Sequence, residues 1–125
     1  MLRIKIKNPD MNLLKTAMEA IAKKLNGNLV ENFVVTGWGL KRKCLFAIPM
    51  ELPYGNGYGV FIDKNGELKI CVDDHGAPLS AVQFAELLEQ TYVALAVATA
   101  AQQLGYNVAN IQELKEGILL DLEVR

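Results

Sequence analysis

The stretch PLSAVQFAELLEQTYVALAVATAAQQLG, residues 78–105, decides the fold because it predicts a long helix around which the rest of the chain is arranged. Ser80 and Gln83 have the spacing of a capping box, which satisfies two free backbone amides at a helix start. Gly105 suits the position just past the helix end, where a left-handed conformation is favoured. One face of the helix is apolar at helical spacing, which predicts packing against a core through Phe84, Leu88, Tyr92 and Leu95.

The second half of this helix is apolar on every side, from Val93 to Ala98. A helix of this kind must be covered on more than one side, but the run is shorter than the about 20 residues of a membrane span. Two explanations stay open: the fold itself wraps this end, or another subunit packs on it. The residues expected at such an interface are Val93, Ala94, Val97, Ala98 and Ala101.

Composition places the chain among globular proteins of one domain, residues 1–125. Hydrophobic residues make up 51% and charged residues 22%, which argues against disorder. The net charge of −1 and the pI of about 5.8 give no electrostatic case for binding nucleic acid or an anionic membrane. The chain opens on alternating apolar and basic residues, which indicate a strand rather than a signal segment, so a cytoplasmic or stromal location is expected.

The rest of the chain reads as short strands and one more helix. A helix with apolar residues at i, i+4, i+7 and i+11 is predicted over residues 14–25, with Asp10 or Asn12 as its cap and Gly27 as its stop. Asn65-Gly66 predicts a two-residue hairpin, and residues 113–117 predict a turn. Strands are predicted at residues 2–6, 29–35, 44–48, 60–62, 68–72, from 106 onward, and at 118–124.

This order, β-α-β-β-β-β-α-β-β, favours an α+β fold of two layers. Consecutive strands suggest a mostly antiparallel sheet, and two amphipathic helices are expected to cover one of its faces.

The order and spacing of these pieces resemble the hypothetical chloroplast reading frame thirty-five family, found in algal plastids, cyanobacteria and other prokaryotes. The resemblance lies in residues 43–48, residues 58–62, Asn65-Gly66, Val72-Asp73 and residues 92–106, after an opening Ile-Lys strand and a Leu- and Ala-rich helix. It implies neither an activity nor catalytic residues, because the family has no biochemical function to carry over. The chain departs from the family at Asp74-His75, where members often carry aromatic residues, so no ligand is carried over to this turn.

One short segment gathers side chains that could do chemistry: Cys71, Asp73, Asp74 and His75. His75 could act as a base or ligand with an aspartate orienting it, and Cys71 could supply a thiolate. The same segment is also typical of a solvated turn between a strand and a helix, with Cys71 as a small strand residue. A single histidine excludes a two-histidine zinc site within one chain. Cys44 and Cys71 lack metal-ligand spacing and are expected as free thiols.

Aromatic and basic residues suggest two further surfaces. The loop at residues 54–59 has the glycines of a phosphate loop but no following helix, so a bulged strand connection or a binding lip with Trp38 or Tyr58 exposed is expected instead. Trp38 stands between two glycines, where it is either an exposed contact anchor or a buried residue that packs over the sheet edge. Lys41, Arg42 and Lys43 follow it, a composition shared by single-strand nucleic-acid surfaces and by charged edge strands.

The sequence therefore predicts a non-enzymatic interaction or assembly module that self-associates or binds a protein partner, with no cofactor, no metal and no membrane. The first alternative is an enzyme or small-ligand site that uses Asp73, Asp74 and His75, with Trp38 and Tyr58 as further ligand contacts. The second alternative is a nucleic-acid accessory protein that uses Trp38 and residues 41–43.

Overall fold

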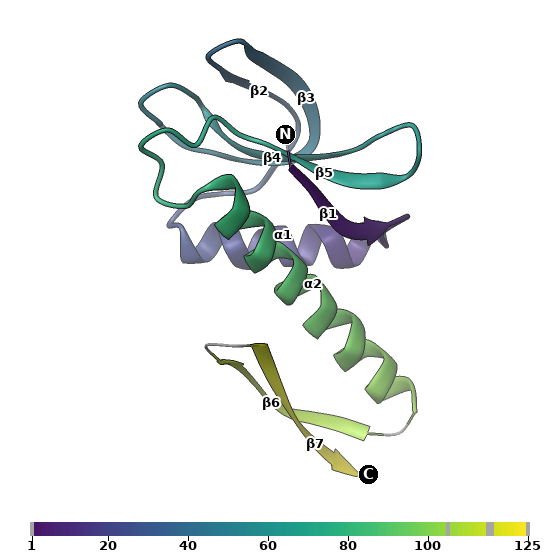
Figure 1. The fold of residues 1–125 in the computed structure, drawn as a ribbon. Helices are drawn as coiled ribbons and strands as arrows, with labels where there is room; N and C mark the ends of the chain where they lie inside the picture. Colours follow the sequence, from purple (N-terminus) through teal and green to yellow (C-terminus); the bar gives the residue numbers. More distant parts are fainter. Residues whose placement is uncertain (1, 105, 115–116, 125) are drawn as a thin grey trace.

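The computed structural model describes residues 2–104, 106–114 and 117–124, with side chains from Ile6 to Leu104. Figure 1 shows a curled sheet, two helices beneath it, and a separate hairpin beside the second helix. In chain order the elements are β1 (Leu2–Lys7), α1 (Met11–Lys24), β2 (Val30–Gly37), β3 (Leu40–Pro49), β4 (Gly57–Ile62), β5 (Glu67–Cys71), α2 (Ala81–Gln103), β6 (Tyr106–Leu114) and β7 (Gly117–Val124).

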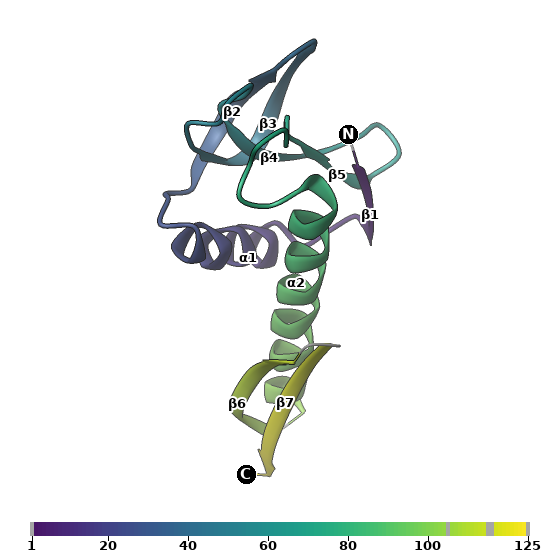
Figure 2. The same ribbon diagram turned by 60° about the vertical axis from the view of Figure 1, so that its left-hand side comes forward.

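Five strands form one antiparallel sheet in the order β1-β5-β4-β3-β2. Both helices pack on the same face of this sheet and cross each other, as Figures 1 and 2 show. The predicted α+β class and the predicted order of strands and helices are confirmed. The predicted stop of α2 at Gly105 and the centre of the predicted turn at residues 113–117 lie outside the described residues.

The predicted capping box is present at the start of α2. The Ser80 hydroxyl accepts from the Gln83 backbone N–H (3.1 Å), and the Gln83 side chain accepts from the Ser80 backbone N–H (2.9 Å). Asp10 rather than Asn12 caps α1, because its carboxylate accepts from two backbone amides of the first turn.

The main core fills the space between the helices and the sheet. Its largest feature is the stack of Tyr58 on Phe84, whose ring centroids are 4.7 Å apart and whose planes differ by 12°. The Tyr58 hydroxyl donates to the Leu79 carbonyl (2.7 Å) and accepts from the Leu79 N–H (3.0 Å), so this buried phenol is satisfied by the segment before α2. Fully buried side chains around the stack include Leu14, Met18, Ile21, Ile48, Leu68, Ile70 and Leu88.

A second, smaller core lies on the opposite face, where the β2–β3 hairpin curls over β4. Gly59 permits this approach, because a Cβ atom there would lie 2.5 Å from the Cys44 sulfur and 2.6 Å from a Val35 methyl carbon. This second core consists of Val35, Cys44, Ala47, Phe61 and Cys71. Both cysteines are free and buried, as expected from the sequence. The hydrogen bond with Cys71 and burial raise the pKa of the Cys44 thiol.

One prediction about a hairpin needs correction. The β4–β5 connection is a longer loop, residues 63–66, and not a two-residue turn at Asn65-Gly66. Its shape comes from Asp63, whose carboxylate accepts from the Asn65 and Glu67 N–H groups (both 2.9 Å). Among the described residues, the last two strands, β6 and β7, pair with each other alone and form a two-stranded sheet beside α2, separate from the five-stranded sheet.

In the part of the chain that the structure describes, neither helix is long and apolar enough to cross a membrane.

Candidate functional site

The tip of the β2–β3 hairpin presents an exposed tryptophan. Gly37 pairs with Leu40, so Trp38 and Gly39 form the connection between the strands. Gly39 adopts the left-handed conformation (φ +67°) that closes such a tight turn. Trp38 projects from this turn and is 84% exposed.

Asp73 holds this tip in place from below. It follows β5, is only 8% exposed, and is the one buried charged residue between Ile6 and Leu104. Its Oδ2 accepts from the backbone N–H of Trp38 (2.9 Å). Its Oδ1 accepts from the His75 backbone N–H (3.3 Å) and lies 2.8 Å from His75 Nδ1. Because an ionised carboxylate only accepts hydrogen bonds, Nδ1 carries the proton.

Two glycines allow Asp73 to come this close. A Cβ atom on Gly37 would lie 2.4 Å from the Asp73 Cβ, a distance that no real pair of side chains shows. A Cβ atom on Gly55 would lie 3.0 Å from the Thr36 carbonyl oxygen and 3.3 Å from the Asp73 Cβ. The glycines therefore let the hairpin tip, the loop around Tyr54 and the segment after β5 meet at one point.

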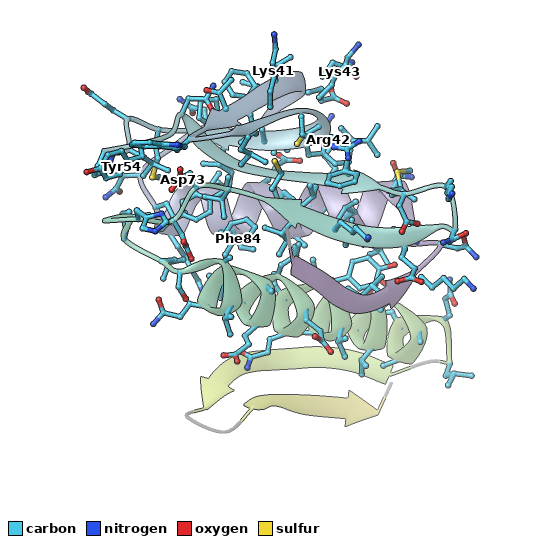
Figure 3. All side chains as sticks on the ribbon, turned by 45° about the horizontal axis from the view of Figure 1, so that its top comes forward. Lys41, Arg42, Lys43, Tyr54, Asp73 and Phe84 are labelled. Atoms are coloured by element: carbon cyan, nitrogen blue, oxygen red, sulfur yellow. The ribbon has the colours of Figure 1, made fainter. Side chains whose placement is uncertain are left out.

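Three aromatic side chains gather over Asp73, and we call Trp38, Tyr54 and His75 the aromatic cluster. The Trp38 and Tyr54 rings are tilted by 56° with centroids 6.3 Å apart, and Tyr54 meets His75 edge to face at 6.2 Å. With Asp73 they line a surface pocket of about 310 Å³. Figure 3 shows Tyr54 and Asp73 side by side at this end of the sheet.

Asp73 and His75 change each other's protonation. The hydrogen bond from the His75 side chain lowers the pKa of Asp73, and the Trp38 N–H lowers it further. The hydrogen bond to Asp73 and the negative charge of Asp73 raise the pKa of His75. The site therefore tends toward an imidazolium–carboxylate pair with Nε2–H directed away from the carboxylate.

This pair alone does not make a nucleophilic catalytic site. A carboxylate that orients a histidine is the base half of such a site, and the nucleophile must lie within hydrogen-bond reach of the base. The four residues that line the pocket include no serine, threonine or cysteine. Cys71 is fully buried in the second core. Among the described residues, no group of three metal-ligating side chains is close enough to hold a metal ion.

The structure separates the sequence-predicted site residues into two groups. Trp38, Asp73 and His75 come together in the pocket. Tyr58 does not join them, because it is fully buried against Phe84. Asp74 faces the start of α2, where its Oδ2 accepts from the Ala81 N–H (2.7 Å).

Sequence reasoning missed two residues of the site. In the sequence, Tyr54 belongs to a glycine-rich loop, and its position beside Gly55 is the signal that could have marked it as an exposed contact. Asn56 fixes the same loop to β2: its Oδ1 accepts from the Thr36 N–H (2.7 Å), and its Nδ2 donates to the Val34 carbonyl (3.0 Å). The Asn56 side chain therefore occupies the hydrogen-bonding edge of β2 where another strand could pair.

The basic run lies in β3 and does not act as one patch. Lys41 and Lys43 point outward from the hairpin, whereas Arg42 turns to the other side (Figure 3). The Arg42 guanidinium carbon lies 4.4 Å from the centroid of the Phe61 ring, so this side chain covers the second core.

The predicted interface residues on α2 also divide. Ala94 and Ala101 are buried within the chain, Ala98 is partly buried, and Val93 and Val97 are exposed. The β6–β7 hairpin lies along this half of α2 (Figures 1 and 2). Part of the apolar run is thus covered within the chain, and part of it is exposed to solvent.

Comparisons with protein-family models, with curated proteins and with solved structures find no match to this chain.

Proposed function

We propose that this protein is a non-enzymatic interaction module that binds a partner protein through the aromatic cluster. The observation that carries this proposal is that the Trp38 side chain is exposed while its backbone is held in place. The indole is 84% exposed, while its backbone is bound to a buried carboxylate. Tryptophan and tyrosine dominate the energetics of protein interfaces, and a site fixed before binding loses little entropy when the partner arrives.

The test compares the partners captured by the wild-type protein with those captured by Trp38→Ala. The matched control is Met11→Ala, which removes another exposed apolar side chain, at the start of α1. We expect a partner that is lost with Trp38→Ala and retained with Met11→Ala. An identical set of partners for all three proteins would contradict the proposal.

Self-association through α2 is a second candidate, because four exposed apolar residues in its second half and at its C-cap form a stripe. The stripe consists of Val93, Val97, Ala100 and Leu104, with spacings of four, three and four residues, as in the seam of a helix pair. Thr99 and Gln102, on another side of the same half, are polar and exposed. Because the side chains of the stripe are exposed, the stripe is not the side on which α2 covers the sheet.

A second copy in antiparallel orientation fits this stripe. The spacing reads the same in both directions, so Val93 would face the partner's Leu104 and Val97 would face the partner's Ala100. No charged residue lies between Glu89 and Glu113 in the sequence, so the pairing brings no like charges together at the stripe. Solution mass measured by light scattering at several concentrations tests this candidate, and a monomer at every concentration would refute it.

A further inference from the structure

We propose that the aromatic cluster recognises an extended, proline-containing segment of its partner in the polyproline II conformation. The inference rests on the proposed interaction function and names the chemistry of the bound segment. Three features support this inference: the angle between the rings of the cluster, the hydrogen-bonding groups that the cluster exposes, and the side-chain hydrogen bonds that already occupy the edge of β2.

The ring geometry favours a compact apolar ring over a flat one. A flat base inserted between two side chains needs parallel rings about 7 Å apart, twice a van der Waals contact. The Trp38 and Tyr54 centroids are only 6.3 Å apart and the planes are tilted by 56°, so no such slot exists between them. Two tilted aromatic faces instead form a groove against which a pyrrolidine ring packs, as in aromatic grooves that bind proline-rich segments.

The exposed polar groups of the cluster are mainly donors. The indole N–H of Trp38 and the hydroxyl of Tyr54 lie on side chains that are 84% and 55% exposed. In the imidazolium form, His75 adds Nε2–H. The one carboxylate, Asp73, already has both oxygens engaged with Trp38 and His75. A polyproline II segment supplies acceptors for these donors, because its backbone carbonyls have no hydrogen-bond partner within the segment and its prolines have no N–H.

Two other occupants fit less well. An extended β-strand would need free backbone groups on the edge of β2, but Asn56 engages Val34 and Thr36 there, and Asp73 engages Trp38. A cationic group would meet no unengaged carboxylate in the pocket, because both oxygens of Asp73 are engaged, and it would be repelled by His75 whenever the imidazole is protonated.

The test uses the intrinsic fluorescence of Trp38, which is the only tryptophan in the chain. The 125-residue chain is titrated with a short oligoproline peptide, and in parallel with a Gly-Ser peptide of equal length and with an oligothymidine strand. We expect a saturable change in emission with oligoproline alone. Tyr54→Ala should weaken binding by about tenfold or more, while Met11→Ala, at an exposed apolar position at the start of α1, should leave it unchanged. Tyr54→Phe keeps the ring and loses the hydroxyl, so it separates packing from hydrogen bonding.

Absence of a saturable change with oligoproline, or binding that Tyr54→Ala does not weaken, would overturn the inference. Binding of oligothymidine that weakens steeply with added salt would overturn it in favour of a nucleic-acid surface that includes Lys41 and Lys43. If oligoproline fails while partner capture still depends on Trp38, the interaction function stands and only the chemistry of the segment is wrong. If both fail, the aromatic cluster is not the binding site.

Discussion

At the scale of single residues, Asp73 and Asp74 are adjacent in the sequence and yet belong to different parts of the molecule. Asp73 binds the hairpin tip and His75, whereas Asp74 accepts from the first N–H of α2. Successive residues leaving a strand point to opposite sides, so this separation follows from backbone geometry. The sequence identified the acidic segment but not which aspartate meets Trp38.

His75 provides a direct test of the pair with Asp73, because it is the only histidine and gives one imidazole signal by NMR. We expect a pKa above the ordinary value of about 6.5, and a return toward that value in Asp73→Asn. A His75 pKa that Asp73→Asn leaves unchanged would show that the hydrogen bond does not form in solution.

The same pair defines a pH window of stability. Since the folded-state pKa of His75 is raised, its contribution is present below the unfolded-state pKa and is lost as the pH rises through the folded-state pKa. Since the folded-state pKa of Asp73 is lowered, its contribution is present above the unfolded-state pKa and is lost as the pH falls through the folded-state pKa. The stability difference between wild type and His75→Ala, measured by urea unfolding, should therefore shrink toward alkaline pH.

Asp74 should behave as a cap and not as a site residue. Asp74→Ala removes one hydrogen bond at the start of α2, so we expect the free energy of unfolding to fall by about 1 kcal/mol. Trp38 emission should stay as in wild type, whereas Asp73→Ala should change it. A change in Trp38 emission with Asp74→Ala would place Asp74 in the site after all.

At the scale of elements, contacts between near neighbours were predictable and contacts between distant segments were not. The capping box of Ser80 and Gln83 could be read from the sequence because both partners lie within one helical turn. The bonds from Asn56 to Thr36 and from Asp73 to Trp38 span 20 and 35 residues, so no local pattern announces them. The β4–β5 loop was misjudged because Asn65-Gly66 is a common hairpin pair, and the carboxylate of Asp63 selects a longer loop instead.

Asn56 should matter for stability although it lies in a loop. Asn56→Ala removes two hydrogen bonds to the edge of β2, so we expect the free energy of unfolding to fall by about 1–3 kcal/mol. The freed edge should also raise the tendency to aggregate, which light scattering detects. Asn28→Ala, at an exposed position before β2, is the control. Equal stability of the two variants would mean that the β2 edge does not depend on Asn56.

At the scale of the whole molecule, α2 is longer than the sheet that it covers. Figures 1 and 2 show its second half running past the sheet with the β6–β7 hairpin beside it. The all-round apolar character of Val93 to Ala98 showed that this half needs cover on more than one side. The sequence could not predict which of these residues the β6–β7 hairpin covers and which a second copy would cover, because either one would bury the same apolar residues.

The stripe of Val93, Val97, Ala100 and Leu104 leads to the last prediction. A carboxylate placed at its centre would be buried in an antiparallel pair next to its symmetry mate, and two unpaired charges in an apolar contact are strongly unfavourable. Val97→Glu should therefore abolish any dimer seen by light scattering. Because Val97 is exposed within one chain, the same change should leave the fold of the monomer intact by circular dichroism.

Gln102→Glu adds the same charge to the same helix on another, exposed side, so it separates an effect of the stripe from an effect of net charge. A dimer lost in Val97→Glu and retained in Gln102→Glu would assign the contact to the stripe. A dimer lost in both variants would show that added negative charge anywhere on the helix prevents association. A dimer lost in neither variant would show that the contact does not involve this side of α2. Either of the last two outcomes would argue against a second copy as the cover of the apolar stripe.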